Sequence, residues 1–265
     1  MFSSSFHRWS PSFALHLAET LAEQGGKPRE LGLRIGLFGA EPWTDGIRVA
    51  LERAFGISAF DIYGLSEIIG PGVAGECEAR DGLHIADDHF LPEIIDPVSG
   101  AVLAPGREGE LVLTTLTKRA MPLVRYRTGD ITTLSLEPCR CGRTSARMAR
   151  VKGRSDDMLI VKGVNLYPSE VERTLLAVDE LAPHYQLVVD RAATLARLEV
   201  QVEPAPEVIA RCGGFAADHP EIESLRRRAA EQLRQATGLS VELTIVAPRT
   251  IPRSEGKAVR VIERG

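Results

Sequence analysis

The sequence contains 265 residues, 44% of them hydrophobic and 26% charged, which is enough to bury the core of one or two globular domains. Its net charge of −4, with basic residues scattered through the chain, argues against a nucleic-acid or anionic-membrane partner. No run approaches the roughly 18 apolar residues of a membrane span, and the first residues lack the apolar segment of a signal peptide, so we expect a cytoplasmic enzyme.

Residues 10–75 predict an α/β unit. A helix begins at Pro11, after the N-cap Ser10, and ends at Gly25-Gly26. The apolar pattern then predicts, in order, a strand at 31–38, a helix at 44–55 and a strand at 59–63. If the two strands are parallel, the turns at 39–42 and 63–67 lie at the carboxyl ends of the strands, where open α/β sheets bind ligands.

Residues 82–150 predict a small antiparallel sheet or barrel, because short alternating segments are separated by Pro and Gly turns. These segments lie at 93–96, 110–114, 123–127 and 131–134. We expect two polar, Gly-containing turns, Thr128-Gly129-Asp130 and Gly153–Asp157, to be functional loops because each leaves an apolar strand. The second turn also separates two differently built halves, so we interpret residues 154–157 as a hinge.

The residues after the hinge predict a smaller α+β domain with a β-α-β-β-α-β succession. Ser169 and Glu172 form a predicted capping box at the start of one helix. The other predicted elements are strands at 158–161, 186–190, 197–202 and 241–246 and a helix at 220–236 that ends at Gly238. The predicted domains are therefore a larger one over 1–153 and a smaller, mobile one over 154–265.

Several motifs occur in the order and spacing of the adenylate-forming superfamily of acyl-CoA synthetases and luciferases. They are YGLSE at 63–67, YRTGD at 126–130, GRSDD at 153–157 and Gly256-Lys257. Within that superfamily, the stretches FGAEPW, TLTKRAMPLVRYRTGD, CRCGR and GRSDDMLIVKGVNLYPSEVE resemble the phenylacetate-CoA ligase family. The resemblance covers nearly the whole chain from Pro11 and implies an α/β adenylate-forming fold, with a partial large N-terminal domain and a smaller α+β C-terminal domain.

The resemblance implies a two-step ligase reaction. A carboxylate, here phenylacetate, attacks the α-phosphate of ATP to give an acyl-adenylate and pyrophosphate. Coenzyme A then attacks the adenylate to give a thioester and AMP. The implied cofactors are ATP, Mg²⁺ and coenzyme A, and the implied substrate is a small aryl carboxylate.

The resemblance also assigns residues to the adenine of ATP. The ring of Tyr63, next to Gly64, would stack on the base. The backbone of Gly39, Ala40 and Glu41 would approach the edge of the base closely. A simpler reading makes Glu41 only an acidic residue at the entry to the following helix.

Four further residues would bind the ribose and the phosphates. Asp130 would accept hydrogen bonds from the ribose hydroxyls, and Arg154 would support this carboxylate. Ser66 would donate a hydrogen bond to a phosphate oxygen, and Glu67 would bind Mg²⁺.

The two half-reactions would use residues of the smaller domain. Lys257 would stabilise the charge that develops on the carboxylate and the α-phosphate in the first step. Rotation at the hinge residue Asp156 would then bring Lys162 and Gly163 toward the pantetheine arm of coenzyme A. The competing reading of Lys257 is a residue of a charged, solvated tail.

One motif of the family does not occur in this sequence. Family members carry a Ser/Thr/Gly-rich phosphate loop in an additional N-terminal region, so the chain resembles their C-terminal three-fifths. Two alternative functions therefore stay open. The first is a CoA ligase or adenylating enzyme for another aryl carboxylate, and the second is a non-catalytic nucleotide- or CoA-binding remnant.

Three cysteines and a histidine form a candidate metal site. Cys77, His84, Cys139 and Cys141 offer the Cys₃His set that suits a tetrahedral structural zinc ion, although the Cys-x-Cys spacing is tighter than usual. The alternative is that Cys77 is a small core residue and His84 a surface residue. With Cys212 the sequence has four cysteines, too few for a disulfide scaffold of this size.

The absent region would normally pair with strands of this chain. Its absence predicts exposed apolar strand edges. We therefore expect self-association, as a homodimer, or association with a second chain that supplies the missing half.

Overall fold

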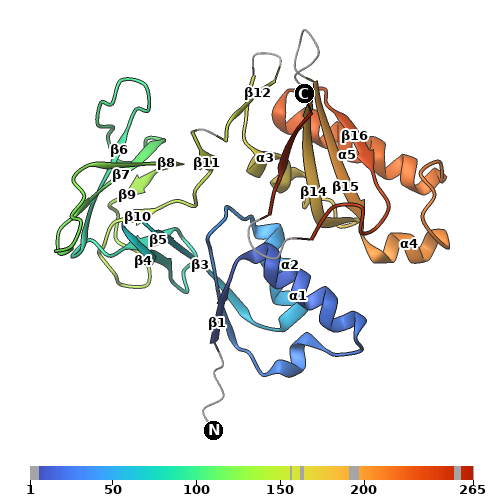
Figure 1. Cartoon of the computed structure of the whole chain (residues 1–265), viewed down its shortest axis with the longest axis horizontal. Coiled ribbons are helices and arrows are strands. Elements are labelled where there is room, and N and C mark those ends of the chain that lie inside the picture. The colour runs from blue at the N-terminus through green and yellow to red at the C-terminus, as the bar shows by residue number, and fades with distance from the viewer. Residues whose placement is uncertain (1–5, 156, 162–163, 191–196, 254–257, 265) are drawn as a thin grey trace. The chain divides into compact units, whose positions relative to one another are not determined.

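A computed structural model describes residues 6–155, 157–161, 164–190, 197–253 and 258–264 (Figure 1). The contacts divide the chain into two compact units. Unit 1 combines residues 1–11, 28–42 and 55–157, and unit 2 combines residues 12–27, 43–54 and 158–265. Among the described residues, no helix is both long and apolar enough to cross a membrane.

Unit 1 contains a seven-stranded mixed sheet. Its spatial order is β1 (Phe6–Trp9), β2 (Ile35–Phe38), β3 (Ser58–Leu65), β4 (Ile69–Glu76), β5 (Leu83–Ile85), β10 (Arg147–Met148) and β9 (Leu134–Ser135). The first three strands are parallel, and all later pairs are antiparallel. The α/β unit was predicted to place its two turns together if its strands are parallel, and the parallel pairing of β2 and β3 is confirmed. The turns that follow β2 and β3 are therefore neighbours.

A second sheet of unit 1 is antiparallel and has four strands. Its order is β11 (Gly153–Arg154), β8 (Tyr126–Thr132), β7 (Gly109–Thr115) and β6 (Phe90–Ile95). Apolar side chains of β4 to β9 form one core between the two sheets, including Val73, Leu83, Leu111 and Leu113 at 0–2% exposure. The antiparallel pairing predicted for residues 82–150 is confirmed, although some of these strands belong to the first sheet and the others to the second.

The Thr128-Gly129-Asp130 segment is not a turn, and this prediction is wrong. It lies inside β8, where the pairing register with β7 shifts between Glu110 and Val112. Gly129 has a φ of +77°, which allows an irregularity in the strand without reversing the chain. As a result, two predicted segments, 123–127 and 131–134, are largely replaced by the continuous strand β8 and the short strand β9.

The start of the chain also differs from the prediction. β1 was not predicted, and the strand expected from residue 31 begins only at Ile35, after the 3₁₀ helix η1 (Pro28–Leu31). The first helix, α1 (Pro11–Glu23), begins at the predicted proline. The second, α2 (Asp45–Phe55), matches its predicted range within one residue.

Unit 2 is an α+β unit around a four-stranded sheet. The order of that sheet is β16 (Glu242–Ile245), β15 (Arg197–Pro204), β14 (Leu181–Asp190) and β17 (Val261–Arg264). Helices α3 (Pro168–Leu175) and α5 (Pro220–Thr237) pack their apolar side chains into the core of this sheet. The other elements after residue 158 are the hairpin strands β12 (Leu159–Val161) and β13 (Val164–Leu166) and the helix α4 (Pro206–Cys212).

Most of α1 and α2 also belong to unit 2. In α2, Gly46 allows a close approach, because a Cβ there would lie 2.5 Å from the Cβ of Leu176. In α1, Glu19 bonds to His184 of β14 and to Arg253. These contacts explain why both helices group with the later residues.

The capping box that we predicted for α3 is wrong. The helix begins at Pro168, with Tyr167 as the N-cap and Glu170 at the third helical position. The Tyr167 N–H donates to the Glu170 carboxylate at 3.4 Å. Proline fits the first helical position because its φ is already helical and no N–H is needed there, which moves the start upstream of Ser169. Glu172 is instead buried, 3.5 Å from the guanidinium of Arg260.

Candidate functional site

The carboxyl ends of β2 and β3 meet closely in unit 1. Gly39 follows β2 directly, and a Cβ on this residue would lie 2.3 Å from the carbonyl oxygen of Ile62 in β3. Gly64 is equally confined, since its Cβ would lie 2.7 Å from the carbonyl oxygen of Ile69. Ala40 has a φ of +70°, so the chain turns sharply after Gly39. The predicted residues Gly39, Ala40 and Glu41 therefore lie beside the strand that carries Tyr63.

The turn between β3 and β4 carries the next two predicted residues, Ser66 and Glu67. Both are exposed. The ammonium group of Lys118 donates to the carbonyl oxygens of Glu67 and Ile68 at 2.7 and 3.0 Å, which ties this turn to the segment after β7. Sequence reasoning missed Lys118, although the residue lies within the stretch TLTKRAMPLVRYRTGD, because its partners are 51 and 50 positions away along the chain.

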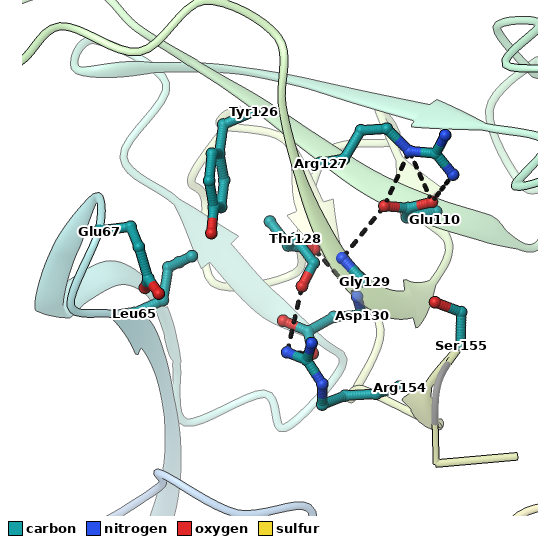
Figure 2. Close-up of a pocket in the computed structure, with 10 residues that line it drawn as sticks. All are labelled: Leu65, Glu67, Glu110, Tyr126, Arg127, Thr128, Gly129, Asp130, Arg154 and Ser155. Carbon is teal, nitrogen blue, oxygen red and sulfur yellow. Dashed lines mark hydrogen bonds and ion pairs between the residues drawn. The ribbon is translucent and has the colours of Figure 1, made fainter.

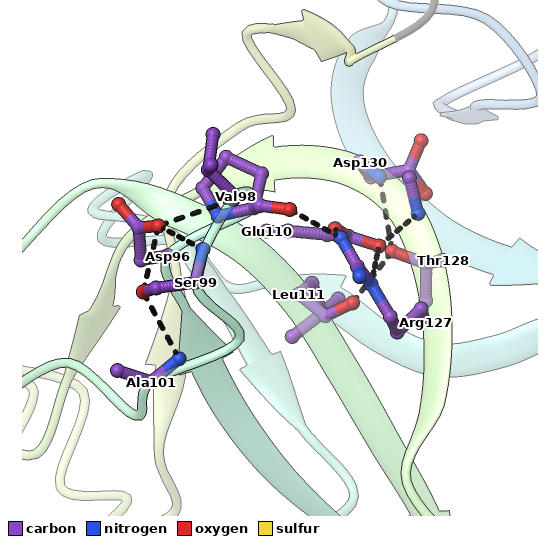
Figure 3. Close-up of polar contacts among 11 residues, drawn as sticks. Asp96, Val98, Ser99, Ala101, Glu110, Leu111, Arg127, Thr128 and Asp130 are labelled. Carbon is purple, nitrogen blue, oxygen red and sulfur yellow. Dashed lines mark hydrogen bonds and ion pairs between the residues drawn. The ribbon is translucent and has the colours of Figure 1, made fainter.

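A buried acid fixes the irregular part of β8. Glu110 of β7 is 3% exposed, accepts the Gly129 N–H at 3.1 Å and forms a bidentate ion pair with Arg127. Arg127 also donates to the carbonyl oxygen of Pro97, and the carboxylate of Asp96 accepts from Val98 and Ser99 in the same turn (Figure 3). These contacts hold β8 at Gly129 and at Arg127, two residues before it. The sequence contains one sign that Glu110 has a structural role, because it is a charged residue within the apolar run GELVLTT.

Asp130 follows this fixed segment and is held by two partners. Its Oδ2 accepts the phenol of Tyr63 at 2.5 Å, and its Oδ1 lies 3.9 Å from the guanidinium of Arg154. Arg154 faces Asp130 because β11 pairs with β8 in the register Arg154 to Asp130. Arg154 also donates to the carbonyl oxygen of Thr128 at 3.2 Å. Strand pairing therefore brings Arg154 to Asp130, and the phenol hydrogen bond joins Tyr63 of the other sheet to the same carboxylate.

Electrostatics fix the state of the Tyr63 phenol. Burial raises the pKa of Tyr63 well above its usual value, and the neighbouring Asp130 carboxylate raises it further. The hydroxyl consequently stays protonated and donates to Asp130 at every physiological pH. The carboxylate of Asp130 is thus oriented by the hydrogen bond from Tyr63 and by the ion pair with Arg154.

Asp130 and Arg154 border an open cleft of about 360 Å³ (Figure 2), whereas Tyr63 is not among its lining residues. Its lining is formed by Leu65, Glu67, Glu110, Tyr126, Arg127, Thr128, Gly129, Asp130, Arg154 and Ser155. Glu67 and Leu65 line one side, and Asp130 and Arg154 the other. Carboxylates, two guanidinium groups, hydroxyls and a phenol thus converge on one polar cleft, which suits a ligand rich in hydroxyl and phosphate groups.

Four predicted site residues lie outside the described residues: Asp156, Lys162, Gly163 and Lys257. The four candidate metal ligands are not among the residues that line the cleft. Their Sγ and ring nitrogen atoms converge elsewhere in unit 1, all within 4.8 Å of one another. His84 is 8% exposed, so the alternative that placed it on the surface is wrong.

Comparisons with known proteins point in one direction. The family of the AMP-binding enzyme C-terminal domain matches residues 163–264. The phenylacetate-coenzyme A ligase of Thermus thermophilus is 48% identical over 259 residues, covering 95% of this chain and 58% of its own length. The chain spans 56–58% of the length of the curated relatives that it matches, all of them phenylacetate-coenzyme A ligases.

Solved structures give the same result. A crystal structure of 2-hydroxyisobutyryl-CoA ligase in the postadenylation state, in complex with 2-HIB-AMP, has a TM-score of 0.90 and 30% sequence identity, covering 99% of this chain and 55% of that one. An open conformation of the same ligase, in complex with 2-HIB-AMP and CoA, has a TM-score of 0.58 and 30% identity, covering 99% and 56%.

Proposed function

The chain belongs to the phenylacetate-CoA ligase family of adenylate-forming enzymes, and on that premise we propose that it acts in the ATP-dependent conversion of phenylacetate to phenylacetyl-CoA, with AMP and pyrophosphate as the other products. The observation that carries this proposal is the cleft in which Asp130 is oriented by Tyr63 and Arg154. The chain spans little more than half of the curated relatives, so the ligase activity itself is part of the proposal.

The cleft supports a nucleotide as the ligand. The carboxylate of Asp130 would accept hydrogen bonds from the two ribose hydroxyls, and Arg154 would orient that carboxylate. The ring of Tyr63 would contact adenine, beside the backbone of Gly39, Ala40 and Glu41. Gly39 keeps the backbone after β2 close to β3, the strand of Tyr63, because a Cβ there would meet the carbonyl oxygen of Ile62.

The phosphates would lie toward the turn after β3. Glu67 borders the cleft and offers carboxylate oxygens, the ligands that Mg²⁺ prefers. Ser66 would donate its hydroxyl to a phosphate oxygen. Bound Mg²⁺ would neutralise phosphate charge, and the chain's part is to position the nucleotide beside it.

Residues of the C-terminal part would complete the two half-reactions. We keep Lys257 as the cation for adenylation, and Lys162 and Gly163 as the CoA-facing pair. Asp156 remains the proposed hinge between domains 1–153 and 154–265. The roles of Gly163 and Lys257 rest on the motifs and on the family match over residues 163–264, and those of Asp156 and Lys162 rest on the motifs.

Nucleotide binding tests the proposal at Asp130. Titration calorimetry of the purified chain with ATP and Mg²⁺ should give a saturable isotherm, and Asp130→Asn should weaken it by about tenfold or more, because a charge-assisted hydrogen bond contributes about 1.5–3 kcal/mol. Asp88→Asn is the matched control, since this carboxylate is exposed and its one ion pair among the described residues is with His89. Absence of binding, or equal loss in both variants, would contradict the nucleotide site.

A second assay tests the substrate. Incubation with ATP, Mg²⁺, coenzyme A and phenylacetate should release AMP and form the thioester. Binding without turnover would contradict the ligase activity of this chain while leaving the nucleotide site in place. Faster AMP release with another aryl carboxylate would favour the alternative substrate class.

A further inference from the structure

We propose that Cys77, His84, Cys139 and Cys141 bind a structural zinc ion that fastens the β9–β10 connection to strands β4 and β5. This inference is independent of the ligase function. Three of the four residues are 5–8% exposed, and only Cys141 reaches the surface. All four ligand atoms lie within 4.8 Å of one another.

The distances between the ligand atoms fit tetrahedral zinc. With Zn–S of about 2.3 Å and Zn–N of about 2.0–2.1 Å, tetrahedral geometry requires S···S of about 3.8 Å and S···N of about 3.5 Å. The Sγ atoms of Cys77 and Cys139 are 3.8 Å apart, and Cys141 Sγ is 3.4 Å from His84 Nε2. The first distance is also far longer than the roughly 2.05 Å of a disulfide bond.

The backbone explains how ligands from three segments meet. Cys77 directly follows β4, and His84 lies in β5, which pairs with β4. Within the β9–β10 connection, the Gly142 N–H donates to the Cys139 carbonyl at 2.9 Å, and Gly142 adopts a φ of +89°. This tight turn brings two thiols only one residue apart toward the same point, which accounts for the short Cys-x-Cys spacing.

A contact with Ser145 orients the imidazole of His84. Nδ1 of His84 lies 3.0 Å from the hydroxyl of Ser145, whereas Nε2 faces Cys141. If the Nδ1–H donates to Ser145, the lone pair of Nε2 is directed to the metal, which is the usual arrangement at zinc-binding histidines. Arg140 supports the same connection by donating to the carbonyl oxygen of Ala79 at 2.5 Å.

A second group of possible metal ligands, in unit 2, is a weaker candidate for a metal site. Cys212, His219 and Glu221 also lie close together. However, His219 Nδ1 accepts the backbone N–H of Glu221 at the start of α5, and the Glu221 carboxylate is paired with Arg211. Glu221 and one ring nitrogen of His219 are therefore already engaged, and Cys212 serves as a control.

The test measures metal content and its ligand field. The full chain is purified under reducing conditions with zinc supplied, and elemental analysis should give about one zinc per chain. Replacement of zinc by Co²⁺ should produce the intense visible bands of a tetrahedral thiolate site. Absence of metal after reconstitution with equimolar zinc, or a weak octahedral cobalt spectrum, would overturn the proposal.

Variants locate the site. Cys141→Ser changes an exposed side chain and should leave the fold intact, yet it should weaken zinc binding at least about tenfold, as loss of an outer-shell partner alone costs 10–100-fold. Ser145→Ala tests that outer shell and should weaken zinc binding with the cobalt spectrum retained. Cys212→Ser should keep the full zinc content. Zinc retained by Cys141→Ser, or lost from Cys212→Ser, would contradict the assignment.

Discussion

At the scale of single residues, Gly39 sets how closely the chain after β2 approaches β3. Gly39→Ala should destabilise unit 1 by about 2–4 kcal/mol, because its Cβ would meet the Ile62 carbonyl oxygen at 2.3 Å and backbone must move. Gly75→Ala is the matched control, as its Cβ would lie 4.0 Å from the side chain of the same Ile62. Urea unfolding of both variants measures the difference, and equal stability would contradict the steric argument.

Motifs named Tyr63, Asp130 and Arg154 from the sequence, and their functional roles stay predictions. The structure shows the three side chains together, because β8 pairs with β11 and the Tyr63 phenol donates to Asp130. Glu110 and Lys118 escaped prediction, because their importance comes from partners 19 and 51 positions away. Such partners become visible only when strands are paired.

At the scale of elements, α1 is attached through an ionic network. Glu19 bonds to His184 and to Arg253, and Arg253 pairs in turn with the buried Glu203 at 2.8 Å. Burial alone would raise the pKa of Glu19, but hydrogen bonding and the charges of His184 and Arg253 outweigh it and lower the pKa to about 2. Because the pKa falls on folding, the network stabilises unit 2 above about pH 4.5 and loses this contribution as the pH falls toward 2.

Replacing this carboxylate should remove the pH dependence. Glu19→Gln should cost about 1–3 kcal/mol in the free energy of unfolding at pH 7, and its stability should fall less than that of the wild type between pH 5 and pH 3. Glu23→Gln, on the same helix but in an exposed ion pair with Arg249, should change little. Urea unfolding at pH 7, 5 and 3 makes the comparison, and parallel pH profiles would rule out this role for Glu19.

Element boundaries show where local patterns fail. The α1 and α5 helices follow their proline starts and glycine ends, since both signals act locally. The Thr-Gly-Asp segment carries the composition of a turn, but Glu110 and the pairing with β7 keep it inside a strand. Two-residue strands such as β9, β10 and β11 contain too little sequence to be recognised without their partners.

At the scale of the whole molecule, the seven-stranded sheet ends at β1, which has a partner on one side only among the described strands. An edge strand presents unpaired N–H and C=O groups, and neighbouring β2 exposes 42% of Ile35. We therefore expect the chain to self-associate at micromolar concentrations. Size-exclusion chromatography with light scattering should show species larger than 28.9 kDa, and Ile35→Lys should reduce them. A monodisperse monomer would contradict this expectation.

The insertion of β10 between β5 and β9 has a kinetic consequence. His84 and Ser145 meet across 61 positions of chain, so this pairing must close a long loop before its contacts repay the lost entropy. The β4–β5 and β6–β7 pairs join neighbours in sequence and can form earlier. β10 should therefore join the sheet late in folding. A metal ion that bridges Cys77 and Cys139 would then form its contacts late in folding, so it would slow unfolding more than it accelerates folding.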